Sequence, residues 1–464
     1  MSVEPPVNVE ASADTEQIVR HAQPLHAAPP VVGRPKPEDA AGFRAVLARK
    51  SFRRLWIGQV FAQLADKFLM FALLVFINLR SGIASAESLL MIAYTLPSVF
   101  LSTAAGVYAD RHDKRHLMVG TNLIRAGIVM LVPLLSWLTG FSGGAWLLLI
   151  PITLAFSSVG QVFAPAEAAS IPSLVSRDQI MGATSLFMTT VVVTLVLGVP
   201  LASLCIAKNP LLPFYVGAIL FIVAAASIWR IPASLRTEQT ASTEHPDLLR
   251  ELKEGLAILR GVAALRIALV ELTVALVVVF TLFALGPSYM TTVLHRSPND
   301  TYIVLIPATL GIIVVASVLG QGSPNIQRSR LVTASMIAAG VMLTGIGVIP
   351  TVLSSLHIAA LLLPVTIAIA LGFGAALGVL LISAFTVLQE ATTAESRGRI
   401  FGGIFAVINA AIAVPLLLAG VLADVFHSAD VPLGGLGVLL LIGGVLAHTK
   451  WRVAMQALDR PGTG

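Results

Sequence analysis

The amino-acid sequence predicts an all-α membrane protein with twelve transmembrane helices in two six-helix bundles related by pseudo-symmetry. Only 12% of its 464 residues are charged, half of the roughly 25% found in soluble globular domains. Apolar stretches of about 20 residues recur along the chain, and each is long enough to cross a hydrocarbon core of about 30 Å as a helix. The sequence does not show the segments of about 10 residues with alternating polarity that outer-membrane barrels require.

The apolar stretches form two sets of six, separated by a polar segment. The leucines of that segment, in PDLLRELKEGLAILR, recur at helical spacing and predict an amphipathic helix along the membrane surface. GVYADRHDKRHLMV in the first half weakly resembles GQGSPNIQRSRLVT in the second, as a two-lobed transporter requires. The predicted spans are residues 54–79, 88–109, 116–138, 145–166, 183–206, 211–231, 267–290, 301–321, 331–352, 356–381, 400–424 and 432–451.

The predicted organisation has five parts. Residues 1–43 are rich in Pro, Ala, Glu and Val and lack the n-region and h-region of a signal peptide, which predicts a disordered cytoplasmic tail. The remaining parts are the first bundle, the linker with its amphipathic helix, the second bundle and a C-terminal tail, at residues 44–231, 232–265, 266–455 and 456–464.

The distribution of basic residues predicts the orientation. An even number of spans places both termini on one side, and lysine and arginine gather on cytoplasmic loops. Twenty-two of them flank the spans on the side of the N-terminus, against three on the other side, Arg80, Lys208 and Arg296. Both termini are therefore predicted to be cytoplasmic, in a bacterial-type inner membrane. The net charge of +6 is explained by orientation, so no nucleic-acid partner is expected.

One short loop concentrates charge in this apolar chain. Between spans 2 and 3, GVYADRHDKRHLMVG has seven ionisable residues in a row, which hold the turn in the cytoplasm because they cannot enter lipid. The pattern Gly106-x-x-x-Asp110-Arg111-x-x-Lys114-Arg115 resembles the signature loop of the major facilitator superfamily. The resemblance extends from about residue 50 to residue 455 and implies a two-bundle transporter.

The resemblance also implies a gating role for this loop. A carboxylate at the end of span 2 can accept hydrogen bonds from the N-terminus of a helix in the other half. Asp110 would take that role, with the start of span 11 near Arg399–Gly402 as its partner and with Gly106 allowing close approach of the backbones. Several of the neighbouring basic residues would act only as anchors.

Four further segments are similar to one branch of this superfamily, the macrolide-efflux and enterobactin-exporter type. They are FRRLWIGQVFAQLAD from residue 52, FAPAEAASIPSLVSRDQI from residue 163, RELKEGLAILR from residue 250 and ESRGRIFG from residue 395. This similarity implies export of a small molecule without specifying the substrate.

Ionisable residues inside the spans are candidates for ion coupling. Asp66 in span 1 and Arg125 in span 3 are predicted at comparable depth near the bilayer centre, where an unpaired charge is costly. Either they form a structural bridge or polar contact within the N-terminal bundle, or Asp66 is a proton-coupling carboxylate. Lys67 points about 100° away around the helix and is expected to be a poor direct partner. Glu271, shallow in span 7, reaches the inner interface, pairs with a basic residue or couples protons.

Neutral polar residues of the spans are candidates to line a central path. Gln59, Gln63 and Asp66 recur at i, i+4 and i+7 and share one helical face, which is expected to face a cavity because lipid would exclude it. Further candidates, which alternatively form hydrogen bonds between helices, are Asn78, Gln161, Thr190, Thr194 and Asn409.

Motifs for enzymatic chemistry are absent from the sequence. It has no phosphate-cradling G-x-x-x-x-G-K-[ST] and no H-E-x-x-H, and Cys205 is its single cysteine. We therefore expect neither an enzyme nor a bound metal or cofactor. Any uphill transport must then draw on an ion gradient or a substrate gradient.

The leading hypothesis is a monomeric secondary exporter in contact with membrane lipids. It would move an amphipathic or hydrophobic small molecule, drug-like or siderophore-like, in exchange for protons by alternating access. Span 1 contains FAQLADKFLMFALL, which also resembles a group of lysophospholipid translocases. A lipid translocase, or a uniporter without proton coupling, is therefore the alternative. A receptor or scaffold without flux is a third hypothesis.

Overall fold

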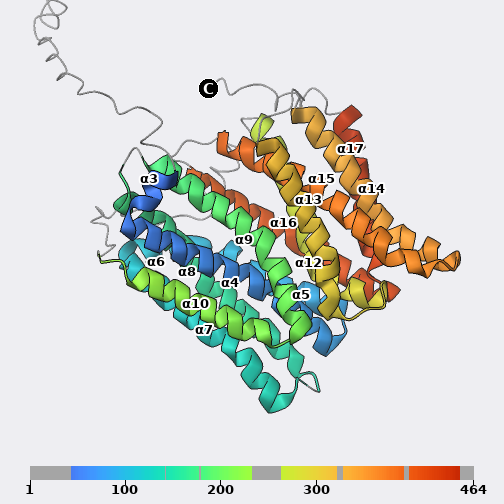
Figure 1. The fold of residues 1–464 in the computed structure, drawn as a ribbon, viewed down its shortest axis with the longest axis horizontal. Coiled ribbons are helices and arrows are strands. Elements are labelled where there is room, and N and C mark those ends of the chain that lie inside the picture. The colour runs from blue at the N-terminus through green and yellow to red at the C-terminus, as the bar shows by residue number, and fades with distance from the viewer. Residues whose placement is uncertain are drawn as a thin grey trace, which may run out of the picture.

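The computed structural model describes residues 43–449 except 142, 177–178, 233–262, 321–327 and 391–396. Figure 1 shows the N-terminal helices, in blue to green, beside the C-terminal helices, in yellow to red. The predicted C-terminal tail (456–464), all of the predicted N-terminal tail (1–43) except Phe43, and most of the predicted linker (232–265) therefore lie outside the described residues. The five-part organisation stays a prediction.

The N-terminal bundle comprises α3 Phe43–Ala48, α4 Lys50–Ser81, α5 Ala84–Phe100, α6 Ser102–Arg111, α7 Lys114–Thr139, η1 Ala145–Leu148, α8 Leu149–Leu174, α9 Ile180–Lys208 and α10 Leu212–Trp229. The C-terminal bundle comprises α12 Ala263–Thr292, η3 Pro298–Thr301, α13 Tyr302–Gly320, α14 Arg328–Ser355, η4 Ala359–Leu361, α15 Leu362–Glu390, α16 Arg397–Phe426 and α17 Asp430–Thr449.

The predicted fold class is confirmed. Among the described residues, eleven helices are long and apolar enough to cross a membrane. The remaining predicted span, 88–109, is two shorter helices, α5 and α6, rather than one. The interruption is confined to Leu101, whose backbone amide donates to the Pro97 carbonyl at 2.8 Å. This broken span lies between α4 and α7 in the chain, so the structure has twelve crossings in its described part.

Helix α4 is the buried axis of the N-terminal bundle. Every residue from Phe68 to Asn78 is buried, because α5, α8, α9, α10 and α12 all pack against this helix. A helix that is apolar on all sides suits such a position. An ionisable side chain near the middle of α4 must therefore find its partners among the surrounding helices.

Small residues bring the helices of the C-terminal bundle together. A Cβ at Gly374 on α15 would overlap a backbone carbonyl of α13, and a Cβ at Gly347 on α14 would lie 2.7 Å from the Asp430 carbonyl. Backbones approach this closely at small residues in membrane helices. Both glycines therefore allow close packing between helices of the C-terminal bundle.

The two bundles meet at the end of the molecule that holds the α4–α5 turn, which we call the Gly82 end. There α5 packs against α12 and α16, while α9 packs against α13. Thr309 on α13 donates a 3.5 Å hydrogen bond to the Val196 carbonyl on α9. We call the opposite end, with the α6–α7 turn, the His112 end.

Candidate functional site

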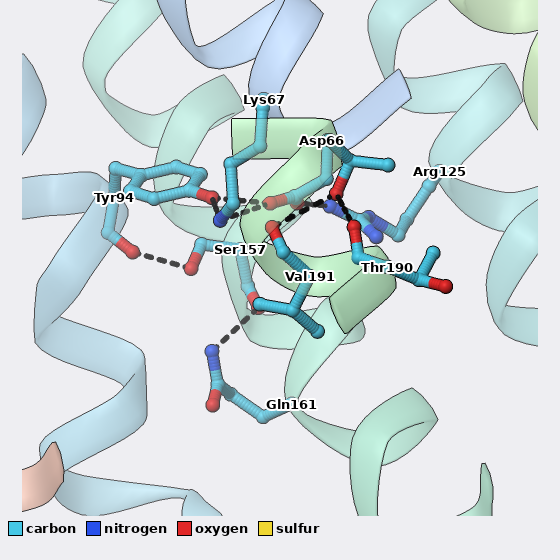
Figure 2. Close-up of polar contacts among 9 residues, drawn as sticks. Asp66, Lys67, Tyr94, Arg125, Ser157, Gln161, Thr190 and Val191 are labelled. Carbon is cyan, nitrogen blue, oxygen red and sulfur yellow. Dashed lines mark hydrogen bonds and ion pairs between the residues drawn. The ribbon is translucent and has the colours of Figure 1, made fainter. Parts of the chain in front are cut away.

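The site is a charged cluster near the middle of α4, formed by Asp66, Lys67, Tyr94 and Arg125. Asp66 and Lys67 come from α4, Tyr94 from α5 and Arg125 from α7. One carboxylate oxygen of Asp66 is paired with the Arg125 guanidinium. The other oxygen accepts hydrogen bonds from Lys67 Nζ at 2.9 Å and from the Tyr94 hydroxyl. Figure 2 shows the Asp66 carboxylate between these two sets of partners.

The structure confirms a bridge between Asp66 and Arg125 and corrects the expectation for Lys67. Consecutive residues do point about 100° apart around a helix. However, the long side chain of Lys67 bends back to Asp66, and its ammonium group also donates to the Tyr94 hydroxyl at 3.1 Å. Tyr94 holds the ammonium and the carboxylate together, so Lys67 is a direct partner of Asp66.

The cluster is more buried at Arg125 than at Lys67. The Arg125 side chain is 5% exposed, against 15% for Asp66 and 20% for Lys67. The guanidinium lies over the rings of Phe156 and Phe221, at 4.1 and 4.5 Å from their centroids. Cation–π contacts of this kind stabilise a desolvated cation. Arg125 is therefore fixed within the bundle, whereas Lys67 retains some accessible surface.

The packing around Arg125 depends on a glycine. A Cβ at Gly160 on α8 would lie 3.2 Å from the central carbon of the guanidinium. Ser157, one turn earlier on α8, donates to the backbone carbonyl of Tyr94. The Gln161 amide donates in turn to the Ser157 carbonyl at 3.4 Å. Helix α8 thus positions both the cation and the tyrosine of the cluster.

The polar candidates of α4 and α9 are largely engaged between helices. Gln59 is 2% exposed, and its amide donates to the Phe187 carbonyl at 3.3 Å. It therefore lies in the contact between α4 and α9. The face that it shares with Asp66 had suggested instead that it would be open to a central path. Thr190 and Thr194 are buried and donate to carbonyls of their own helix. Trp56 donates to the Thr190 hydroxyl at 2.9 Å.

The remaining neutral candidates divide into two groups. Gln63, Gln161 and Asn409 are partly exposed, as a lining residue should be, and stay predictions. Asn78 is buried and forms hydrogen bonds between helices, which is the second of its two predicted roles. Its amide donates to Glu87 on α5 and, at 3.1 Å, to Ser288 on α12. It joins the two bundles instead of lining a path between them.

A second polar cluster, which we call the Glu87 junction, consists of Asn78, Glu87, Ser288 and Asp424. Ser288 on α12 donates to Glu87 at 2.8 Å. Asp424, near the end of α16, accepts from the backbone amides of Ala84 and Ser85 at 2.7 and 2.9 Å. Sequence reasoning missed Glu87 and Asp424. A lone acid in the apolar stretch from 84 to 100 was the available signal for Glu87.

The charged loop between α6 and α7 is held by contacts within the N-terminal bundle. Asp113 caps α7 by accepting from the amides of Arg115 and His116. Arg115 donates to the Ile231 carbonyl at 2.8 Å and lies over the Trp229 ring. These contacts support an anchoring role for Arg115.

The other loop residues show different surroundings. Lys114 is buried and Arg111 is exposed. Nothing in the described part of the structure lies within 4 Å of a Cβ at Gly106, and the close approach expected of this glycine stays a prediction. The side chains of Asp110 and of Arg399–Gly402 lie outside the described part of the structure, and their contact stays a prediction.

Glu271 on α12 is 4% exposed. A carboxylate this buried does not reach the interface by extending its side chain, so the first of its three predicted roles is not supported. Pairing and proton coupling stay open for Glu271.

The comparisons with known proteins decide the family. The family model described as Major Facilitator Superfamily matches residues 55–377. The chain belongs to this superfamily. Macrolide efflux protein A of Streptococcus pyogenes is 24% identical over 379 residues, covering 80% of this chain and 89% of that protein. The multidrug efflux pump Tap of Mycobacterium bovis is 26% identical over 362 residues, covering 74% and 80%. The resemblance to the macrolide-efflux branch is confirmed.

Solved structures show the same fold. A bacterial homolog to the human lysosomal transporter Spinster aligns with a TM-score of 0.63 and 13% identity, covering 89% of this chain and 98% of the other. The nucleoside transporter NupG aligns with a TM-score of 0.59 and 12% identity, covering 88% and 99%. The protein is therefore a multi-pass membrane transporter of the superfamily, and not an enzyme.

Proposed function

We propose that this facilitator is a secondary exporter of the cytoplasmic membrane, which moves an amphipathic or hydrophobic small molecule outward in exchange for protons. The observation that carries the proposal is the Asp66 cluster, in which a carboxylate midway along α4 is paired with two cations, one from α4 and one from α7. Charges at that depth are costly and are typical of ion or substrate pathways. The names of the relatives, a macrolide efflux protein and a multidrug efflux pump, support the direction and the substrate class.

The arrangement of the bundles supports alternating access. The positive-inside rule assigns the His112 end to the cytoplasm and the Gly82 end to the outside. The Glu87 junction then joins the two bundles on the outer side. A conformation closed on the outside is one of the two that an alternating-access exporter must adopt. Both termini are cytoplasmic in this proposal.

Protonation of Asp66 is the coupling step that the cluster can perform. With all groups ionised, the cluster has one negative and two positive charges. A proton on Asp66 removes the anion that holds Arg125 and Lys67, so the salt bridges weaken. Because Arg125 is fixed by two aromatic rings, the freed Asp66 and Lys67 side chains are the parts that rearrange. The proton that binds Asp66 and the transported substrate would therefore compete for the same arrangement of the Asp66 and Lys67 side chains.

The test is flux in proteoliposomes. The purified protein is reconstituted, a pH gradient is imposed and accumulation of a radiolabelled macrolide is measured, with a fluorescent lysophospholipid as a second probe. We expect wild-type accumulation to require the gradient. Asp66→Asn should lose accumulation but keep exchange of labelled for unlabelled substrate, because a permanently neutral side chain cannot release a proton.

The matched control is Asp430→Asn, which removes a carboxylate from the start of α17. Its transport should equal that of the wild type. If transport persists unchanged after the gradient is collapsed and in Asp66→Asn, proton antiport is wrong and a uniporter is favoured. Movement of the lysophospholipid alone would favour a lipid translocase, and binding without flux would favour a receptor.

A further inference from the structure

The Glu87 junction contains a carboxylate in unusual surroundings. Glu87 is fully buried, and one of its oxygens accepts from both Asn78 and Ser288. Its second oxygen is buried without a hydrogen-bond partner. The contacts of this side chain in the described structure include no cation. An ionised carboxylate placed here would be an uncompensated charge between two apolar bundles, which is strongly unfavourable.

The nearby helix N-terminus does not compensate for that charge. Glu87 lies in the first turn of α5, where the helix dipole favours an anion. Asp424 already occupies this position, since it accepts from the first two backbone amides of α5. Two carboxylates in one dry junction disfavour each other's ionised forms. The closed junction therefore accommodates one charge, that of Asp424, and a neutral Glu87.

The other ionisable groups around Glu87 do not change this balance. On α4, Arg80 is exposed, and its guanidinium lies 5.0 Å from the Phe76 ring centroid. On α12, the Tyr289 hydroxyl donates to the Ile346 carbonyl, away from the junction. On α16 the facing group is Asp424, and the part of α8 at this end, residues 149–160, has no ionisable side chain.

We propose that Glu87 is a proton-binding site that controls the outer gate: the bundles close on the outside only when Glu87 is protonated. When the gate opens, Glu87 separates from Ser288, meets external water and releases its proton to that side. When the gate closes, it takes a proton from the same side. The proton therefore crosses no membrane at this site, and the gate responds to external pH independently of any antiport through Asp66.

The sign of the response follows from linkage. The closed state holds one proton more than the open state, so falling pH favours closure, by up to about tenfold in the closed-to-open ratio per pH unit. The response should level off below about pH 4.3, the pKa of a glutamic acid in water, where both states are protonated. Protonation of Asp424 would act in the opposite direction, because a neutral acid is a weaker acceptor for the α5 amides.

The experiment measures the distance between the bundles. Spin labels replace two exposed residues at the Gly82 end, Lys208 at the end of α9 and Ser355 at the end of α14. The background is Cys205→Ser, and the full-length protein is placed in lipid nanodiscs. Distance distributions are recorded by double electron–electron resonance between pH 4 and pH 8. We expect the short-distance population to grow as the pH falls.

Variants separate Glu87 from other titrating groups. Glu87→Gln should keep the short distance at every pH, because the amide stays neutral. Ser288→Ala should retain the pH response but move it to lower pH, since the closed state loses one hydrogen bond. Asp66→Asn should retain a change of distance with pH in the same direction, because Glu87 is intact in this variant. These last two variants keep the test valid if Glu87→Gln does not fold.

Three results would overturn the proposal. A wild-type distance that does not change with pH would exclude a gate controlled by protons. Opening at low pH would assign the response to Asp424. Loss of the response in Asp66→Asn, with retention in Glu87→Gln, would place the sensor in the central cluster.

Discussion

The close contact between α5 and α16 makes Gly420 a position where one methyl group should open the outer gate. A Cβ at Gly420 would lie 2.8 Å from the Cβ of Ser88 and 3.0 Å from the Ala84 carbonyl oxygen. Ser88 is fully buried, so its helix cannot yield without moving α5 away from α16. Gly420→Ala therefore strains the closed state, whereas the open state separates these helices and relieves the strain.

The size of the effect follows from the cost of overpacking. Inserting a methyl group into a packed contact costs about 1–3 kcal/mol. At about 1.4 kcal/mol per factor of ten, the closed-to-open ratio should fall by about 5-fold to about 150-fold. Alanine also gains about 1 kcal/mol of helix propensity over glycine. That gain applies equally to the open and closed states and cancels in their ratio.

The assay is the Lys208–Ser355 label pair at a pH where the wild type is closed. Gly420→Ala should transfer population to the longer distance. The matched control is Gly435→Ala on α17, where no atom of the described residues lies within 4 Å of the added Cβ. Its distance distribution should be that of the wild type. Equal distributions for both variants would show that the α5–α16 contact does not hold the gate closed.

Three further outcomes are expected. Asp66→Asn should lower stability by about 3–5 kcal/mol, as for a broken buried ion pair, measured by thermal unfolding in detergent. Asp424→Asn should weaken outer closure by about 0.3–2 kcal/mol through the lost charge–dipole interaction, seen as a longer label distance, whereas Asp430→Asn should not. Gly374→Ala should lower the melting temperature, because overlap with α13 outweighs the gain of about 1 kcal/mol in helix propensity, whereas Gly435→Ala should raise it.

The sequence predicted the helices well because the bilayer imposes their length and polarity. The span predicted at 54–79 lies within α4, and the span at 183–206 lies within α9. Helices also continue beyond the apolar core, which hydropathy does not detect. The tenth span was predicted from 356, yet α15 starts at Leu362 after a short turn and η4.

The sites were less predictable because they depend on which helices meet. Depth along the helices correctly suggested the Asp66–Arg125 bridge. The same reasoning failed for Lys67, whose long side chain and Tyr94 partner override its direction on the helix. Asn78 could not be placed from its own span, because its partner Ser288 is in the other bundle. Contacts between bundles depend on the conformational state, which one sequence does not specify.

The contact of Asp424 with α5 gives the predicted Asp110 contact a counterpart at the other end of the molecule. Asp424 lies near the C-terminus of α16 and caps the N-terminus of α5. Asp110 lies near the C-terminus of α6, with the N-terminus of α16 as its predicted partner. Because the second span and α16 run in opposite directions, the predicted Asp110 contact would give each end one carboxylate paired with one helix N-terminus. If the bundles tilt against each other, both contacts cannot be held at full strength, so we expect that forming one contact favours release of the other.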